Sequence, residues 1–333
     1  MRILITTGIF PPKVGGPSQY AKNLAEVWQK SGHEVLVRTF NIENKLPTGV
    51  RHIWFFFKII PAVLKADFVL ALDTYSVGFP TVFASWVLGK KVMIRTGGDF
   101  LWESYVERTK EKVLLRNFYE DDNVYLNIKE KVIFSITKWT LKNTTNLIFS
   151  TKWQRDIFIK AYRLDEKKIH IVENYYGPKE SDVETTSKDF IATTRKWVWK
   201  NLDLLKNIVH RMQAKRPEVE LYLSNDKYEE FMNIIKNSYA VVLVSLGDIS
   251  PNMILDAIRM NRPFICTEEV GIFDRIKDAG IFVDPLSENE IENAILKLLN
   301  PVEYEKAREK VKSFNFVHTW EEIGEEFIKI YNK

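Results

Sequence analysis

Two carboxylates, Asp248 and Asp256, flank what the sequence predicts to be the start of a helix. Asp248 lies in the loop after a short apolar, β-branched run, which is typical of a buried strand. Ser250 and Pro251 follow, and Ser is a common N-cap while Pro is well tolerated at the first helical position. The free N–H groups at a helix start attract anions. The stretch 245–260 therefore predicts an anion-binding site.

Two glycine-containing loops in the first half also follow predicted strands. Gly15 and Gly16 follow the first apolar run, and a Gly-Gly-Asp loop ending at Asp99 follows the run 91–94. Neither loop carries the dinucleotide fingerprint GxGxxG. Ligands of open α/β sheets bind at the carboxyl ends of strands, so we expect both loops to belong to one site; the alternative for the second is a plain tight turn. Ser18 is the expected N-cap of the helix after the first loop.

Composition limits the classes of function. The 333 residues suit two domains, and 45% hydrophobic with 28% charged residues is typical of a globular protein. A net charge of +4 is too small to indicate a nucleic-acid partner, although it suits anionic substrates or an anionic membrane surface. One cysteine, Cys266, excludes a disulfide framework, and no signal peptide or transmembrane stretch is visible, so we expect a cytoplasmic protein. Five histidines do not cluster, and we assign none of them to catalysis or to a metal: His33, His52, His170, His210 and His318.

Strands and helices alternate along the whole chain, which predicts two parallel sheets covered by helices. The composition turns polar at 178–188, and we place the domain boundary there. The predicted domains are 1–177 and 178–315, and a last amphipathic helix lies within 316–333.

The segment 51–65 is aromatic and basic (RHIWFFFKIIPAVLK). We expect a helix that packs on the sheet, because helices that cover parallel sheets are often this apolar. The alternative is a peripheral contact with a membrane surface or an acceptor, in which Trp54 and Phe55 to Phe57 insert at an interface.

Five features, in order along nearly the whole chain, resemble the retaining GT-B glycosyltransferases of the glycosyltransferase family 4 type (glycosyl transferases group 1). The features are the strand, double-glycine loop and helix at 3–37, the strand end Glu173-Asn174, Arg195 and Lys200 with four residues between them, Asp248 and Asp256 with seven between them, and the aromatic C-terminal stretch 313–333.

This resemblance implies a GT-B fold: two Rossmann-like parallel-sheet domains that face each other across a cleft, with the C-terminal helix crossing back to the N-terminal domain. It implies that Arg195 and Lys200 grip the donor diphosphate, Asp248 holds the donor sugar and Asp256 reaches the ribose. Basic side chains and helix N–H groups can stabilise a leaving diphosphate without a metal. The implied donor-binding residues are Gly15, Gly16, Arg195, Lys200, Asp248, Ser250, Asn252, Met253 and Asp256.

On the acceptor side, Asp99, or with less support Asp73, is the candidate for orienting or deprotonating the acceptor hydroxyl. The implied catalytic residues are Asp99, Arg195, Lys200 and Asp248. The expected partners are a UDP-, GDP- or ADP-linked sugar and a saccharide or lipid-linked acceptor, as in polysaccharide biosynthesis. No cofactor is expected, and a contact with the inner face of the membrane is the alternative placement.

The sequence departs from this family in three places. Asp248 and Asp256 stand where Glu is usual, and a Gly-Gly-Asp loop stands where many members have His. Between Leu223 and Tyr239 the usual strand–helix unit is shortened, so the C-terminal domain is reduced. Two other functions therefore stay open: a non-catalytic nucleotide- or sugar-binding protein on this fold, and a nucleotide-sugar epimerase.

Overall fold

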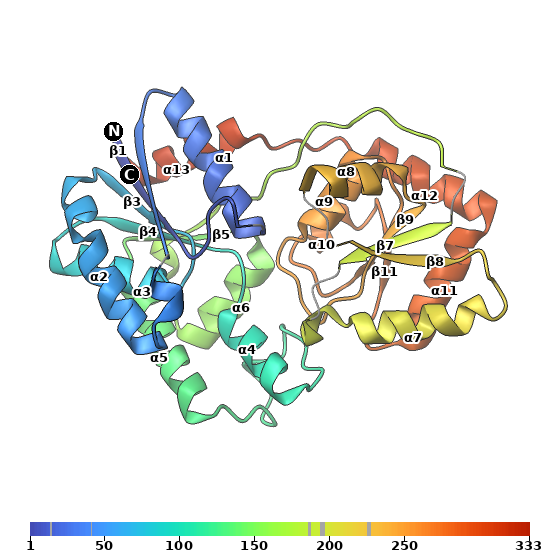
Figure 1. Ribbon diagram of the computed structural model, residues 1–333, viewed down its shortest axis with the longest axis horizontal. Helices are drawn as coiled ribbons and strands as arrows, with labels where there is room; N and C mark the ends of the chain where they lie inside the picture. The colour runs from blue at the N-terminus through green and yellow to red at the C-terminus, as the bar shows by residue number, and fades with distance from the viewer. Residues whose placement is uncertain (14, 41, 186–187, 194–196, 225–227) are drawn as a thin grey trace. The chain divides into compact units, whose positions relative to one another are not determined.

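The computed structural model describes residues 1–333 apart from 14, 41, 186–187, 194–196 and 225–227 (Figure 1). Contacts divide the chain into two compact units, each built on its own parallel sheet. The alternation of strands and helices in the sequence predicted this α/β architecture, and the prediction is confirmed. Unit 1 comprises Met1–Leu101, Asn123–Tyr175 and His318–Lys333, and unit 2 comprises Trp102–Asp122 and Tyr176–Val317.

The six-stranded sheet of unit 1 has the order β2-β1-β3-β4-β5-β6. Every residue of β3 and β4 is buried, which suits the wholly apolar β3, whereas β4 ends in two buried polar residues, Arg95 and Thr96. The strands are β1 (Arg2–Thr7), β2 (Glu34–Thr39), β3 (Phe68–Ala71), β4 (Val92–Thr96), β5 (Asn146–Phe149) and β6 (Ile169–Ile171).

The helices of unit 1 are α1 (Gly16–Lys30), α2 (Thr48–Lys65), α3 (Gly78–Val87), α5 (Ile128–Asn143), α6 (Lys152–Tyr162) and α13 (Trp320–Tyr331), with short 3-10 turns η1 (Ile42–Lys45) and η2 (Glu166–Lys168). Helix α4 (Phe100–Thr109) begins in unit 1 and continues into unit 2.

The first helix starts earlier than the sequence predicted. Gly15 is the N-cap of α1 and makes no side-chain capping bond. Ser18, the expected cap, lies buried inside the first turn. The prediction was wrong because Pro17, with its fixed φ, already fits a position in the first turn and lets the helix begin at Gly16.

The C-terminal helix α13 belongs to unit 1, as the resemblance implied. Its backbone meets α1 closely, because Trp28 Nε1 donates to the carbonyl oxygen of Gly324 at 3.1 Å. A Cβ at residue 324 would lie 3.0 Å from Val27 Cγ1, so a side chain there would push the helices apart. Ile323 and Phe327 are fully buried beside it.

The five-stranded sheet of unit 2 has the order β11-β10-β9-β7-β8. Among the residues described between β8 and β9 there is one helix, α8, in keeping with the shortened sequence there. The strands are β7 (Asp189–Thr193), β8 (Glu220–Ser224), β9 (Ala240–Leu243), β10 (Phe264–Thr267) and β11 (Ile281–Val283). The helices are α7 (Leu202–Gln213), α8 (Tyr228–Asn237), α9 (Asn252–Arg259), α10 (Phe273–Ile276), α11 (Glu288–Leu299) and α12 (Pro301–Ser313), with the turn η3 (Val198–Lys200).

Residues 102–122 come between two parts of unit 1 in the sequence and pack in unit 2. Trp102 lies 5.6 Å from Trp199 between ring centroids. The backbone N–H of Leu115 donates to the carbonyl of Leu246 at 3.2 Å. A Cβ at Gly247 would lie 2.6 Å from Leu115 Cβ, so this segment fits only a glycine at that position.

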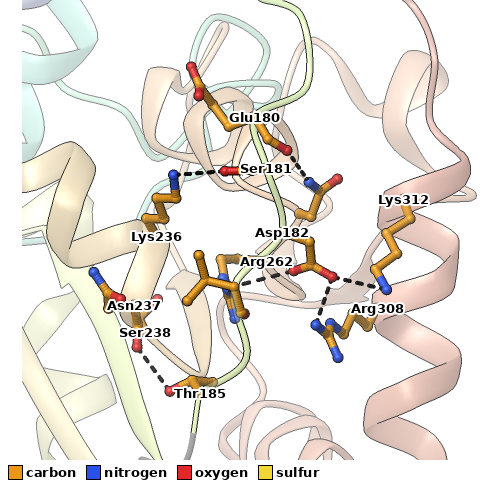
Figure 2. Close-up of polar contacts among 12 residues, drawn as sticks. Glu180, Ser181, Asp182, Thr185, Lys236, Asn237, Ser238, Arg262, Arg308 and Lys312 are labelled. Atoms are coloured by element: carbon orange, nitrogen blue, oxygen red, sulfur yellow. Dashed lines mark hydrogen bonds and ion pairs between the residues drawn. The ribbon is translucent and has the colours of Figure 1, made fainter.

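The polar segment 178–185 is bound along unit 2 by its own side chains (Figure 2). Lys179 Nζ donates to the carbonyls of Ile258 and Val311 at 2.7 and 2.6 Å, and burial lowers the Lys179 pKa to about 8. Glu180 pairs with Arg259 at 2.6 Å. The charged residues that gave this segment the composition of a linker therefore attach it to one unit.

Asp182 is the centre of this attachment. Its carboxylate lies 2.7 Å from Arg308 Nη2, 3.0 Å from Lys312 Nζ and 3.7 Å from Arg262 Nη2. The Arg262 side chain is fully buried, and it also donates to the carbonyl of Val183. A buried guanidinium is stable only with such partners, so Asp182 compensates for the burial of Arg262.

We predict that Asp182→Ala lowers the free energy of unfolding by about 2 kcal/mol, because Arg262 stays buried without its carboxylate. Urea unfolding followed by fluorescence measures this, and Asp203→Ala, at a fully exposed residue, is the matched control.

Burial acts to raise the Asp182 pKa, but the Lys312 hydrogen bond and the Arg308 charge outweigh it and lower the pKa. The stabilisation should therefore be complete above pH ~4 and be lost as the pH falls further. Equal stability of the two variants would contradict the role given to Asp182.

Candidate functional site

The chain between β7 and α7 brings Lys200 to the carboxyl end of the unit 2 sheet. Lys200 is the last residue of the turn η3. The N–H of Val198 at the start of this turn donates to Glu107 Oε1 at 2.6 Å, and the carbonyl of Trp199 accepts from Leu246 N at 2.8 Å. These bonds fix the turn from both sides. Arg195, the other expected diphosphate ligand, lies outside the described residues.

Lys200 and Asp248 form an ion pair with 2.6 Å between Nζ and Oδ2. Their side chains are 11% and 14% exposed, so little water screens the pair. Lys200 Nζ also lies 4.2 Å from the centre of the Trp199 ring, a cation–π contact. The structure thus brings together two residues that lie 48 positions apart in the chain and that the sequence analysis placed in one site.

The backbone of Asp248 is held by the loop after β10. Its N–H donates to the carbonyl of Glu269 at 2.8 Å, and its carbonyl accepts from Gly271 N at 2.9 Å. This short parallel bridge fixes the loop between β9 and α9. The Asp248 carboxylate is therefore positioned by its backbone as well as by Lys200.

The helix α9 begins one residue later than the sequence predicted. Pro251, not Ser250, is the N-cap, and no side chain caps the helix. Ile254 and Leu255 donate to the carbonyl of Pro251, so the helix forms without help from the serine hydroxyl.

This start leaves hydrogen-bonding groups for a ligand. Within the described chain, the N–H groups of Asn252 and Met253 make no hydrogen bond, and neither does the buried hydroxyl of Ser250. Unpaired N–H groups at a helix start favour an anion. Asp256 lies one turn further along and is partly buried. The anion site stays a prediction, and the helix start on which it rests has Pro251 as its N-cap.

Arg116 and Glu269 are neighbours of this loop that the sequence analysis missed. Arg116 Nε lies 2.7 Å from Glu269 Oε2. Burial raises the pKa of the Glu269 carboxyl, and the Arg116 charge acts against this rise. The signal in the sequence was a Glu-Glu pair directly after the apolar run 263–267, the same pattern of strand end and carboxylate that singled out Asp248.

In unit 1, the Gly-Gly-Asp loop follows β4 and is fixed by buried polar groups. Gln154 Nε2 donates to Thr96 Oγ1 at 2.8 Å and to the carbonyl of Gly98 at 3.2 Å. Asp99 is buried, and its Oδ1 accepts from Leu101 N at 3.1 Å. The acid predicted to act on the acceptor therefore also supports the first turn of α4.

A buried arginine beside this loop is a further residue that the sequence analysis missed. Arg95, the fourth residue of β4, lies with its guanidinium 4.1 Å from the centre of the Tyr20 ring and donates to Asn174 Oδ1. A Cβ at Gly97 would lie 2.2 Å from Arg95 Nη1, so a side chain there would displace the guanidinium from its present position. His318 Nδ1 lies 3.0 Å from the carbonyl of Asn174. Asn174, which the resemblance singled out, thus connects the strand end to α13.

Asp73 has a structural role. Its carboxylate accepts N–H groups from Tyr75, Val77 and Gly78 at 2.9 to 3.2 Å. Burial raises its pKa, and these bonds act in the opposite direction. Both candidate acids, Asp99 and Asp73, therefore accept backbone N–H groups, and the choice between them stays a prediction. Among the described residues, no group of three or more His, Cys, Asp or Glu side chains could hold a metal ion.

No family model matches the sequence, and no curated protein matches it. Solved structures do match over the full length. Sucrose-phosphate synthase from Thermosynechococcus elongatus has a TM-score of 0.72 at 12% identity, covering 99% of this chain and 98% of that one. Anabaena HepE in complex with UDP has a TM-score of 0.68 at 11% identity, covering 100% of both chains.

A third structure is WaaG, a glycosyltransferase involved in lipopolysaccharide biosynthesis. It has a TM-score of 0.68 at 13% identity and covers 99% of both chains. These structural neighbours are GT-B glycosyltransferases, and at such low identities the likeness shows the fold alone. The fold class predicted from the sequence is therefore confirmed.

We predict that Lys200 and Asp248 are energetically coupled. Each single change, Lys200→Ala or Asp248→Ala, should lower the free energy of unfolding by about 2 kcal/mol, because it leaves a poorly hydrated charge alone. The double variant should lose about 1–2 kcal/mol less than the sum of the single losses. The control cycle uses Lys206 and Asp203, an exposed pair at 3.8 Å for which we expect no coupling. Additive losses at Lys200 and Asp248 would contradict the pairing.

Proposed function

We propose that the protein is a retaining glycosyltransferase, which moves a sugar from a UDP-, GDP- or ADP-linked donor to a carbohydrate or lipid-linked acceptor. The observation that carries this proposal is the uncapped start of α9 beside the Lys200–Asp248 pair. Free N–H groups and a cation at one strand end suit a diphosphate. The GT-B fold and the family resemblance of the sequence support the same conclusion.

The donor side is assigned to unit 2. In the reaction the bond between the anomeric carbon and the diphosphate oxygen breaks, and the diphosphate leaves with an additional negative charge. Lys200, Arg195 and the N–H groups of Asn252 and Met253 would stabilise that charge. The Asp248 carboxylate, now paired with Lys200, would accept hydrogen bonds from the donor sugar while the lysine turns to the phosphate.

The remaining donor contacts follow from the resemblance and from position. Asp256 would accept hydrogen bonds from the ribose hydroxyls, and the Ser250 hydroxyl, which has no partner in the described chain, would donate to a phosphate oxygen. Gly15 and Gly16 are donor-binding residues by the resemblance alone, and without side chains they would let a ligand come close to their backbone.

The acceptor side is assigned to unit 1. The acceptor hydroxyl oxygen forms the new bond to the anomeric carbon, and its proton has to leave. Asp99 would orient this hydroxyl or take the proton. Arg95 lies at the same strand end with its charge partly satisfied by Asn174 and Tyr20. It would orient Asp99 or an acceptor oxygen.

A second candidate function is a binding protein that does not turn over its ligand. The observation that favours it is the closed Lys200–Asp248 pair, in which each charge already has its partner. The side chains of Asp248 and Asp256 are also shorter than the glutamates that are usual at these positions in the glycosyltransferase family that the sequence resembles. A nucleotide-sugar epimerase is the third candidate, and the products of the reaction separate it from the others.

We predict that a nucleoside diphosphate raises the melting temperature of the protein and that a nucleotide sugar of the same base is consumed. Thermal shift with UDP, GDP and ADP identifies the base, and nucleotide release with the matching sugar donors measures turnover. Lys200→Ala should lower kcat/KM about 100-fold, because it removes a cation that stabilises the leaving group. Lys206→Ala, on an outward position of α7, should keep full activity.

The outcomes separate the three candidates. A product with the donor's anomeric configuration, read by NMR, supports retaining transfer, and inversion overturns retention. A thermal shift without turnover identifies a binding protein, and a new nucleotide sugar identifies an epimerase. No shift with any of the three nucleotides contradicts the site itself.

We also predict that activity does not depend on a divalent metal, since Lys200, Arg195 and the α9 N–H groups would neutralise the diphosphate. Turnover should change less than twofold after dialysis against EDTA. Restoration of a lost activity by Mg²⁺ or Mn²⁺ would show that a metal takes part.

A further inference from the structure

Helix α2 carries two apolar stripes, and only one of them packs inside unit 1. The inner stripe contains Phe55, Ile59 and Val63, which are fully buried, so the packed helix predicted for 51–65 is confirmed. The outer stripe consists of residues at helical spacing over about four turns. Its members are Val50, Ile53, Trp54, Phe57, Pro61 and Leu64, all exposed, with Ile53, Trp54 and Phe57 at 62%, 55% and 65%.

Aromatic contacts extend this stripe over neighbouring helices. Phe56 lies 5.2 Å from Phe83 of α3 between ring centroids, and Phe83 lies 5.8 Å from Trp139 of α5. Trp86 of α3 continues the series, 6.2 Å from Trp139, and is 60% exposed. Figure 1 shows α2, α3 and α5 beside one another on unit 1. We call the exposed apolar side chains of these three helices the aromatic face: Val50, Ile53, Trp54, Phe57, Leu64, Trp86, Val87, Ile128 and Val132.

The three helices of the aromatic face carry mainly positive charges. Helices α2 and α3 contain no Asp or Glu. In α5, Glu130 is buried and completes the capping box with Asn127, so it presents no charge at the surface. The cations of α2 and α5 are Arg51, Lys58, Lys65, Lys129, Lys131, Lys138 and Lys142. Of these, Lys58 is already paired with Glu43 of η1 at 2.6 Å, so the attraction for anions is assigned to the others.

Exposed apolar patches of this kind mark interaction surfaces. We infer that the aromatic face lies on an anionic lipid surface, with the outer stripe of α2 inserted at the level of the headgroups. Trp and Phe favour that level, and lysines beside them attract acidic headgroups. A second copy of the chain is a less suitable partner for the aromatic face, because the lysines of α2 and α5 in the two copies would repel each other. The charges therefore select lipid over self-association.

The contact is peripheral in this proposal. No helix of the described chain combines the length and apolar character that crossing a bilayer requires. The outer stripe occupies one side of α2 while the opposite side stays packed in unit 1, so the helix lies parallel to the surface. The inference does not depend on which reaction the protein catalyses.

Vesicle co-sedimentation of the full chain tests the proposal. Vesicles of phosphatidylcholine alone are compared with vesicles that contain about 30% phosphatidylglycerol, which gives the second set a negative surface charge. We expect strong binding to the anionic vesicles, weakened by high salt, and at least about tenfold weaker binding to the neutral ones.

Variants distinguish the aromatic face from unspecific adhesion. Trp54→Ser/Phe57→Ser should lower the partition coefficient about tenfold or more without lowering the melting temperature, because both side chains are exposed. Val302→Ser/Tyr222→Ser removes two exposed apolar side chains from unit 2 and is the matched control, for which we expect unchanged binding. Lys129→Glu/Lys131→Glu should reduce binding to anionic vesicles only.

Three results would overturn the proposal. The wild-type chain could fail to sediment with anionic vesicles, or the Trp54/Phe57 variant could bind as well as the control. Light scattering could also show a dimer that the same variant abolishes while vesicles are not bound, and the face would then be a contact between two copies of the chain.

Discussion

The ion pair between Lys200 and Asp248 is the interaction on which the candidate donor site depends. It joins η3 to the loop before α9 at a place where water is largely excluded. Two charges in such surroundings are stable only together, so the loop and the turn have to keep their relative position. The bonds of Asp248 to Glu269 and Gly271 hold the same loop from the other side. The start of α9 is thereby fixed, and its first N–H groups have no partner among the described residues.

The segment 102–122 supports this arrangement from outside the strands. Glu107 fixes the start of η3, Leu115 fixes the backbone at Leu246, and Arg116 pairs with Glu269. The glycine at 247 is required because Leu115 and Trp102 come so close. The segment 102–122, which interrupts unit 1 in the sequence, therefore helps to fix the loops of unit 2. This arrangement makes the donor loops depend on residues far away in the sequence.

Much of the fold could be predicted because its cause is local. Apolar runs of strand length and helical spacing gave the parallel sheets, and the strand ends pointed to Asp248 and the Gly-Gly-Asp loop. The helix caps were predicted less well: Ser18 and Ser250 have the right side chains, yet the prolines next to them set the helix starts. Arg95, Arg116 and Glu269 were missed because burial and pairing, not residue type, give them their importance.

The sequence by itself determined the α/β class, the order of the elements and the residue types at the strand ends, because hydrophobic periodicity acts over a few neighbouring residues. Only the tertiary structure decided which charges meet. The pairing of Lys200 with Asp248, the attachment of 178–185 through Asp182 and the exposure of the outer stripe of α2 all depend on contacts between distant segments. Burial changes the free energy of a charge or an apolar side chain, and burial is a property of the folded chain alone.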